Sequence, residues 1–226
     1  MAKTYRIGTR TSPLALSQAE EILEALRKFY PDFKAKIIGI DTYGDRDKVT
    51  PISQIEGTDF FTREIDNVLL KGGLDFAVHS AKDLPDTLIE GLVTAAQTSP
   101  IDPYDALVSR NGLKLAELPR RARIGTSSVR RKTQLRAYRE DFDILDIRGN
   151  IEERLEKLDN SSMDAVVIAA CGLVRLGLEK RITERIPFEI IKPHPLQGAL
   201  AIVTRAEDSK LHSLLLVIDS REVVLL

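Results

Sequence analysis

Two short segments of this chain each occur twice, and this repeat is the feature that most restricts its fold. The segment Ile7–Thr11 resembles Ile124–Ser128, and Leu74–Val78 resembles Met163–Val167. Each pair lies within a series of alternating strand and helix patterns that runs in the same order. Alternating β and α patterns are typical of a mostly parallel sheet covered by helices. We therefore predict two similar α/β lobes.

The first series predicts three strands and two helices. Ser12 and Pro13 are typical of a helix N-cap and first turn, and Gly72–Gly73 of a helix end. Ala15, Ala19, Ile22, Leu23 and Leu26 have the spacing of a buried helical stripe. We expect strands at 5–8, 35–40 and 74–78, helices from Ser12–Pro13 to about Phe29 and from about Asp59, and a polar loop at 42–57.

The second series repeats this order. We expect strands at 123–125, 143–147 and 164–169, with helices beginning at Ser128 and Ile151. Proline-rich breaks at 99–103 and 193–195 disfavour both helix and strand. These breaks are typical of hinge crossings between lobes. After the second break, a strand at 199–204 and a helix at 207–217 would return the chain to the first lobe.

The predicted fold is therefore a two-lobed α/β protein with hinge crossings and a central cleft. We assign residues 1–98 and about 199–226 to lobe 1, and residues 103–192 to lobe 2. Ligands of parallel α/β sheets bind beyond the carboxyl ends of the strands. The candidate residues are therefore those that follow the strands.

Composition excludes several classes of function. The 226 residues carry 33 Lys and Arg against 34 Asp and Glu, a net charge of −1, which argues against a general nucleic-acid binder. The chain shows neither an export signal nor about eighteen consecutive apolar residues, so we expect no membrane partner. A single cysteine, Cys171, and three dispersed histidines offer neither an internal disulfide nor a metal site. A reducing cytoplasm fits best.

Basic and hydroxyl side chains gather after the predicted strands, where helix N-termini favour anions. Two arginines in a first helical turn oppose the helix dipole, which a bound anion would offset. Any one of these segments alone is more often solvated surface, but their shared position favours an anion site. Its residues are Arg10 and Ser12 in lobe 1, and Thr126, Ser127, Ser128, Arg130, Arg131, Arg148, Asn150 and Arg154 in lobe 2.

The segment Val78–Pro85 also leaves a strand end. Asp83, beside Lys82, is the candidate general acid or base, although a Lys-Asp pair near a proline is by itself more often a surface turn. We favour a neutral, hydrogen-bonded structural role for His79 over proton transfer. Cys171 follows a buried strand among apolar residues, which favours a core thiol over a nucleophile.

Taken together, these segments resemble the porphobilinogen deaminase, or hydroxymethylbilane synthase, family. The resemblance rests on segments 9–15, 78–85, 125–131, 148–150, 172–177 and 197–199. It implies two lobes like those of type II periplasmic binding proteins, with a cleft that holds pyrroles. It also implies a transferase of porphyrin biosynthesis, which joins four porphobilinogen units head to tail on a dipyrromethane primer and releases ammonia at each step.

The resemblance also implies roles for individual residues. Asp83 corresponds to the catalytic aspartate, with Lys82 beside it. The carboxylate-binding arginines correspond to Arg10, Arg130, Arg131, Arg148 and Arg154, and further binding positions to Ser12, Ser80, Thr126, Ser127, Ser128, Asn150 and Gln197. The expected ligands are dipyrromethane and porphobilinogen or another carboxylate-bearing pyrrole.

The sequence departs from the family pattern at several positions. The family has a third, C-terminal domain whose loop cysteine binds the primer, and the sequence ending at Leu226 contains no equivalent cysteine. Cys171 occupies a position where the family has a small apolar residue, so we do not expect covalent attachment. Thr58 and Asp59 replace a lysine and a small residue, Pro100 and Tyr104 replace arginines, and Leu196 replaces a glycine.

Two hypotheses accommodate these departures. The first is a short deaminase that holds its primer non-covalently or receives a third domain from a separate chain, with activity impaired by the missing domain. The second is a non-catalytic binding module for an anionic pyrrole or polycarboxylate.

Overall fold

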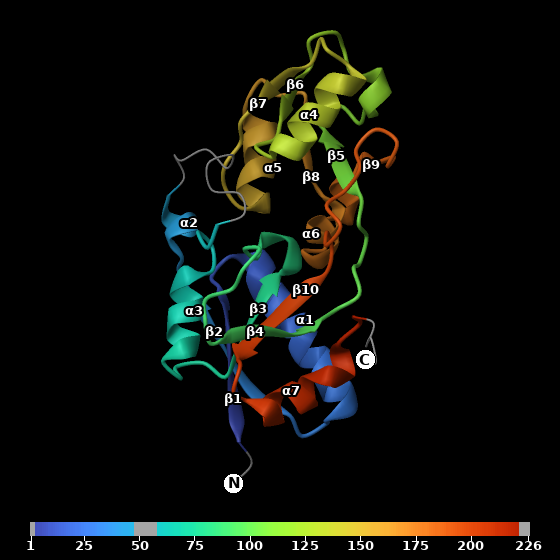
Figure 1. Ribbon diagram of the computed structural model, residues 1–226. Coiled ribbons are helices and arrows are strands. Elements are labelled where there is room, and N and C mark those ends of the chain that lie inside the picture. The colour runs from blue at the N-terminus through green and yellow to red at the C-terminus, as the bar shows by residue number, and fades with distance from the viewer. Residues whose placement is uncertain (1–2, 48–57, 222–226) are drawn as a thin grey trace. The chain divides into compact units, whose positions relative to one another are not determined.

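The computed structural model describes residues 3–47 and 58–221, and these form two compact α/β units (Figure 1). Among the described residues, unit 1 comprises 3–46, 58–101 and 198–221, and unit 2 comprises Asp47 and Asp102–Gln197. The chain therefore passes into unit 2 after Ile101 and returns at Gly198. Residues 48–57 of the predicted loop, and residues 1–2 and 222–226 of the predicted lobe 1, lie outside the described residues.

Unit 1 is built on a five-stranded sheet in the order β2-β1-β3-β10-β4. Its strands are β1 (Thr4–Arg10), β2 (Lys34–Ile40), β3 (Phe76–Ser80), β4 (Leu92–Gln97) and β10 (Leu200–Arg205). Its helices are α1 (Pro13–Phe29), α2 (Tyr43–Arg46), α3 (Arg63–Leu70) and α7 (Ser209–Leu215), with 3-10 turns at Ala81–Asp83 and Leu216–Ile218.

Helix α1 forms as the sequence predicts. Ser12 is its N-cap and accepts a hydrogen bond from the Ala15 amide at 3.3 Å, while Pro13 occupies the first turn, where no amide donor is needed. All five residues of the predicted apolar stripe are buried. Four of them, Ala19, Ile22, Leu23 and Leu26, form the core of this face with sheet residues that include Ile7, Phe76 and Ile202. Burial of that stripe fixes the helix against the face of the sheet.

Unit 2 has a second five-stranded sheet, in the order β7-β6-β8-β5-β9. Its strands are β5 (Asp105–Ser109), β6 (Arg123–Gly125), β7 (Asp143–Leu145), β8 (Ala165–Ala169) and β9 (Glu184–Ile186). Its helices are α4 (Val129–Tyr138), α5 (Ile151–Asn160) and α6 (Ala170–Arg175), with 3-10 turns at Leu115–Glu117 and Glu179–Arg181.

The internal repeat predicted from the sequence is present in the strand register. Ile7 pairs with Phe76 and Gly8 with Ala77 in unit 1, and Ile124 pairs with Ala165 and Gly125 with Val166 in unit 2. The carboxylates of Asp75 and Asp164 each accept the amide of the first strand's arginine, Arg6 or Arg123, at 2.7 Å. The two-lobed α/β fold class is thereby confirmed.

Each sheet is mixed, with four strands in one direction and one opposed. The opposed strand is β10 in unit 1 and β5 in unit 2. In both units it is the first strand after the chain enters from the other unit. A strand that enters from outside the repeated βαβ series needs no crossover helix, so it can pair antiparallel.

Several boundaries differ from prediction. Helix α3 begins at Arg63, because residues 59–62 form a turn in which the Asp59 carbonyl accepts the amides of Thr62 and Arg63. Strand β7 ends at Leu145, because the Ile147 amide and carbonyl bond the Ser127 side chain in place of a strand. The predicted 42–57 loop contains the short helix α2. The sequence analysis did not predict β4, β5, β9 or α6.

Candidate functional site

In unit 1, the candidate residues follow β1 and β3. Arg10 forms an ion pair with Asp45 of α2, with its Nε at 3.0 Å from one carboxylate oxygen, and stacks on the Phe61 ring at 4.5 Å. The Ser80 Oγ accepts a hydrogen bond from the Nε2 of the buried Gln18 at 2.9 Å and lies 3.4 Å from its Oε1, to which it donates. Arg10 is therefore fixed at the strand end by a carboxylate within its own unit.

Lys82 and Asp83 lie on the 3-10 turn that directly follows β3. The turn is anchored where the Ala81 amide donates to the Ala199 carbonyl at 3.0 Å, and Ala81 itself is buried. The Asp83 side chain is exposed and Lys82 is half-buried. An anchored backbone with an exposed carboxylate suits a group that must meet a ligand without reorganising.

His79, four residues before Asp83, is buried in β3. Its Nε2 has no hydrogen-bond partner among the described residues. Burial, reinforced by the positive charge of Arg10, lowers the pKa of His79 to about 4, and the Asp83 carboxylate opposes the shift. His79 is therefore neutral at pH 7, as the structural interpretation expected, although the hydrogen bond expected for it is not present at Nε2.

In unit 2, three hydroxyl residues connect β6 to α4. The Ser127 Oγ donates to the Ile147 carbonyl at 2.8 Å and accepts the Ile147 amide at 2.9 Å, which joins the ends of β6 and β7. Ser128 is the N-cap of α4 but makes no side-chain cap hydrogen bond. The Thr126 Oγ1 is buried and has no hydrogen-bond partner in the described part of the chain. This edge thus has polar capacity that the protein does not use itself.

Arg130 and Arg131, in the first turn of α4, share one buried carboxylate. Asp105, the first residue of β5, is fully buried and lies 2.8 Å from the Arg130 Nη2 and 2.6 Å from the Arg131 Nη2. Burial would raise the pKa of Asp105, but the positive charges of Arg131 and Arg130 hold it below its usual value. An internal anion therefore offsets part of the dipole cost that the sequence analysis assigned to a bound ligand.

The remaining unit 2 candidates lie after β7 and at the end of the unit. Arg148 donates to the Asp47 carbonyl at 2.7 Å, and Arg154 donates to the Gly149 carbonyl at 2.8 Å. Asn150 caps α5 by accepting the Glu153 amide at 2.8 Å. Gln197 donates to the Pro103 carbonyl at 2.7 Å and to the Asp105 carboxylate at 3.1 Å. All lie at or beside the carboxyl ends of β6, β7 and β8, except for Gln197, which supports Asp105.

Comparison with known proteins identifies the family. Residues 5–213 match the sequence model described as "Porphobilinogen deaminase, dipyromethane cofactor binding domain". The chain belongs to the porphobilinogen deaminase family. It is 46% identical over 217 residues to the porphobilinogen deaminase of Xanthomonas axonopodis pv. citri, covering 96% of this chain and 71% of that protein. It is also 46% identical to the enzyme of Natranaerobius thermophilus, covering 96% and 70%.

Solved structures of other proteins show the same fold. The methionine binding protein MetQ matches with a TM-score of 0.57 at 15% identity, covering 95% of this chain and 88% of MetQ. The regulatory domain of OxyR2 from Vibrio vulnificus matches with a TM-score of 0.53 at 15% identity, covering 96% and 94%. These similarities confirm the periplasmic-binding-protein-like fold class.

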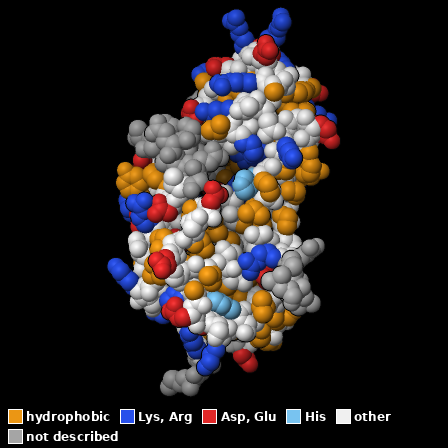
Figure 2. Space-filling view, in the orientation of Figure 1, with side chains coloured by type: hydrophobic (Ala, Val, Ile, Leu, Met, Phe, Trp, Pro, Cys, Tyr) orange, Lys and Arg blue, Asp and Glu red, His pale blue; other side chains and the backbone are white. Residues whose placement is uncertain are grey.

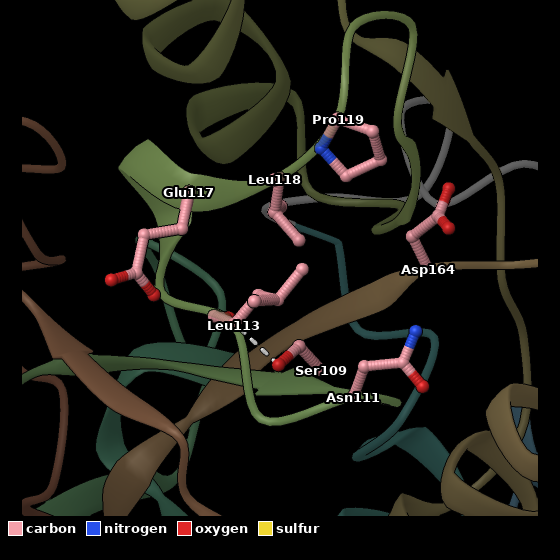
Figure 3. Close-up of a pocket in the computed structure, with 7 residues that line it drawn as sticks. All are labelled: Ser109, Asn111, Leu113, Glu117, Leu118, Pro119 and Asp164. Carbon is pink, nitrogen blue, oxygen red and sulfur yellow. Dashed lines mark hydrogen bonds between the residues drawn. The ribbon is translucent and has the colours of Figure 1, made fainter.

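A surface pocket of about 180 Å³ in unit 2 is lined by Ser109, Asn111, Leu113, Glu117, Leu118, Pro119 and Asp164 (Figure 3). It lies at the opposite edge of the sheet from the candidate residues of this unit. Asp164 precedes β8 and Ser109 ends the opposed strand β5, so both mark the amino edge of β6 and β8. The Ser109 Oγ donates to the Leu113 carbonyl at 2.7 Å, and Asp164 binds the Arg123 amide. These polar groups serve the fold, and the pocket is not the candidate site.

One further prediction, the core position of Cys171, agrees with the structure. Cys171 is free and 5% exposed, as expected of a core thiol. The described residues contain neither a cluster of potential metal ligands nor a helix long and apolar enough to cross a bilayer. On the face shown in Figure 2, Lys and Arg side chains lie among acidic and apolar ones.

Sequence reasoning missed Asp45 and Asp105, the carboxylates that hold the candidate arginines. Asp45 lies on a four-residue helix within a segment predicted as a loop. Asp105 carried a signal, since it is an acidic residue that directly precedes the apolar run Ala106–Val108 and is far too buried there to remain unpaired. Its partners lie 25 and 26 residues away, so local patterns could not name them.

Proposed function

We propose that this chain acts as a porphobilinogen deaminase, a transferase that condenses porphobilinogen units head to tail and releases ammonia at each step. The observation that carries the proposal is the family match across residues 5–213, which includes Asp83 on its anchored turn and the arginines of both units. The comparisons give no support to the alternative of a non-catalytic binding module.

The residues of unit 2 fit the carboxylates of the family's dipyrromethane. Arginine guanidiniums match carboxylates in shape and charge, and Arg130 keeps 24% of its side chain exposed. The Thr126 Oγ1, which has no partner among the described residues, and the Ser128 hydroxyl, which makes no cap hydrogen bond, add neutral donors at the same edge. We propose that these residues hold the group together with Arg131, Arg148 and Arg154. When bound, the dipyrromethane supplies the pyrrole end to which porphobilinogen is joined.

Asp83 is proposed to act on the substrate. Its exposed carboxylate would accept hydrogen bonds from pyrrole N–H groups and would stabilise the positive charge that develops on the substrate carbon as ammonia leaves. Lys82, the adjacent residue on the turn, would orient substrate carboxylates. Arg10 and Ser12 follow the neighbouring strand β1 and would add binding capacity in unit 1. Neutral His79 would not supply a proton at pH 7.

Three finer points belong to the same proposal. The primer is held without a covalent bond by this chain, because Cys171 is buried. A separate chain that supplies the family's third domain would increase turnover. The single cysteine is consistent with a reducing cytoplasm.

The test is turnover of porphobilinogen, measured as uroporphyrin absorbance after oxidation, with and without added dipyrromethane. Asp83→Asn should lower the rate about a hundredfold or more while fold and affinity persist, because the amide keeps the shape and loses the charge. Asp86→Asn, at an exposed aspartate three residues further on, is the matched control and should react like the parent. A parent inactive in both reactions, or an active Asp83→Asn variant, would contradict the proposal.

A further inference from the structure

Asp105 binds three side chains at the unit 2 site. Its Oδ1 accepts from the Arg131 Nε at 2.9 Å and from the Gln197 Nε2 at 3.1 Å, and its Oδ2 accepts from the Arg130 Nη2 at 2.8 Å. Gln197 is itself held by the Pro103 carbonyl. Because Asp105 is fully buried, each of these bonds is shielded from water.

The internal repeat shows that the fold does not need this charge. Asp105 pairs with Ala169, the last residue of β8, as Leu200 pairs with Ser80, the last residue of β3. Asp105 and Leu200 therefore occupy equivalent positions in the two sheets. In each unit, a helix follows the first strand of the repeat, β1 or β6, and the third residue of that helix is Ala15 in α1 and Arg131 in α4. Unit 1 builds the same corner of the fold from apolar residues.

Asp105 restricts the two guanidiniums differently. Arg131 is 8% exposed, and each of its three nitrogens meets an acceptor, which are Asp105, the Val167 carbonyl at 3.2 Å and the Gln197 Oε1 at 3.5 Å. The Arg130 Nη1 donates to the Lys192 carbonyl at 2.6 Å and its Nη2 to Asp105, while part of its side chain reaches solvent. Arg131 is thus immobilised, and Arg130 is oriented with donors to spare.

We propose that Asp105 is a positioning residue, which fixes Arg130 and Arg131 in the orientation that binds a ligand carboxylate. This inference rests on the proposed function, since the ligand is a carboxylate-bearing pyrrole. Two guanidiniums and one buried carboxylate leave one net positive charge, which matches one carboxylate of the ligand. The opposite interpretation is that Asp105 is a competing anion, which occupies donors that the ligand would otherwise use.

The two interpretations predict opposite changes in ligand affinity for the variant Asp105→Asn. If Asp105 positions the arginines, Asp105→Asn weakens binding, because the amide can accept from one arginine only and presents an N–H group to the other. If Asp105 competes, the same variant binds anions more tightly, because a negative charge has been removed. Asp105→Glu keeps the charge and should restore part of the parent affinity.

The experiment measures the affinity for porphobilinogen by calorimetry, steady-state kinetics, and the Arg Nε–Hε resonances of the ligand-free protein by NMR. We expect Asp105→Asn to raise the Kd and KM about tenfold or more with kcat changed much less, and to shift and broaden the Arg131 resonance. Asp159→Asn removes the exposed pair with Arg181 in the same unit and should change none of these. Circular dichroism checks that each variant is folded.

Unchanged or tighter binding by Asp105→Asn, or an unchanged Arg131 resonance, would overturn the inference. A parent that binds no porphobilinogen would instead refute the proposed function. The arginine resonances are recorded without ligand, so they test the positioning role of Asp105 even if the parent binds no porphobilinogen. A shift in Asp105→Asn that Asp105→Glu reverses would support positioning, and an unshifted spectrum would refute it.

Discussion

Replacing the buried Asp105–Arg131 pair by apolar residues should be far less harmful than breaking it. Arg131→Met leaves the fully buried Asp105 with a single cationic partner, the partly exposed Arg130, and Asp105→Leu leaves a guanidinium of 8% exposure without its carboxylate. Removal of one partner from a buried pair costs about 3–5 kcal/mol, whereas replacement of both by apolar groups of similar volume is often neutral or stabilising. The double variant copies the apolar corner of unit 1, where Leu200 takes the place of Asp105. We expect it to lie within about 1 kcal/mol of the parent.

The assay must report on unit 2 by itself, because two units need not unfold together. Hydrogen–deuterium exchange of peptides from β5 and β8 in increasing urea provides this, with peptides from β1 and β3 as the internal control. Each single variant should lower the unfolding free energy of the β5 and β8 peptides and leave the unit 1 peptides unchanged. Single variants that cost less than about 1 kcal/mol, or a double variant no more stable than either single one, would refute the reasoning.

The same variants should differ in their response to acid. Because the pKa of Asp105 is lowered in the folded protein, the ion pairs contribute their full stability above the unfolded value of about 3.9, and lose it as the pH falls through the lower folded value. The double variant lacks this carboxylate. Below about pH 4 its unit 2 should therefore become more stable relative to the parent.

Three further outcomes are expected. Arg148→Ala should weaken porphobilinogen binding by about 1.5–3 kcal/mol in calorimetry, as loss of a charged hydrogen bond does, and unchanged affinity would return Arg148 to a structural role. Protein from a porphyrin-producing host should show no dipyrromethane adduct on Cys171 by denaturing mass spectrometry, since that thiol is buried, and an adduct there would refute this assignment. Burial raises the pKa of Asp66 to about 6. The buried carboxylate therefore lowers the free energy of unfolding by its full amount above pH 6 and by nothing below about pH 3.8. Asp66→Asn should therefore add up to about 3 kcal/mol at pH 8 and little at pH 3, whereas an equal gain at both pH values would contradict the assigned shift.

The sequence predicted the duplicated parts of the fold most accurately. The reason is a close contact, present in each unit, between a glycine of the first strand and a hydrophobic residue that precedes the neighbouring strand. A Cβ on Gly8 would lie 2.2 Å from the Leu74 side chain, and one on Gly125 would lie 3.0 Å from the Met163 sulfur. The same close contact between neighbouring strands imposes the same residue types twice, so the repeat is visible in the sequence. Position-specific steric constraints of this kind are local enough to recognise in a single chain.

The parts that sequence reasoning missed depend on distant partners. Strands β4 and β5 are short apolar runs, and such runs do not reveal whether they form strands or which neighbour they pair with. Asp45 and Asp105 acquire their meaning only when the fold brings Arg10 and Arg131 to them. The sequence could therefore indicate a set of candidate arginines near strand ends, but their internal counter-ions could not be predicted.

The repeat also separates what the scaffold requires from what the chemistry requires. Ala81 and Ala170 directly follow the equivalent strands β3 and β8. Each donates its amide to the carbonyl of the residue just before the opposed strand, which is Ala199 before β10 and Tyr104 before β5. The next two residues are Lys82 and Asp83 in unit 1, but Cys171 and the buried Gly172 in unit 2.

The position where the entering strand meets the helix, α1 in unit 1 and α4 in unit 2, shows the opposite distribution of charge. It is apolar in unit 1, with Ala15 and Leu200, and charged in unit 2, with Arg131 and Asp105. A duplicated scaffold folds with either set, so packing alone requires neither the Lys-Asp turn nor the paired arginines. The proposed chemistry is divided between the units. In unit 1, the Asp83 carboxylate would stabilise the developing positive charge. In unit 2, the buried Asp105–Arg131 pair would orient Arg130 to bind a carboxylate. Residues that break a repeat in this way are the ones to vary first when function, as distinct from folding, is tested.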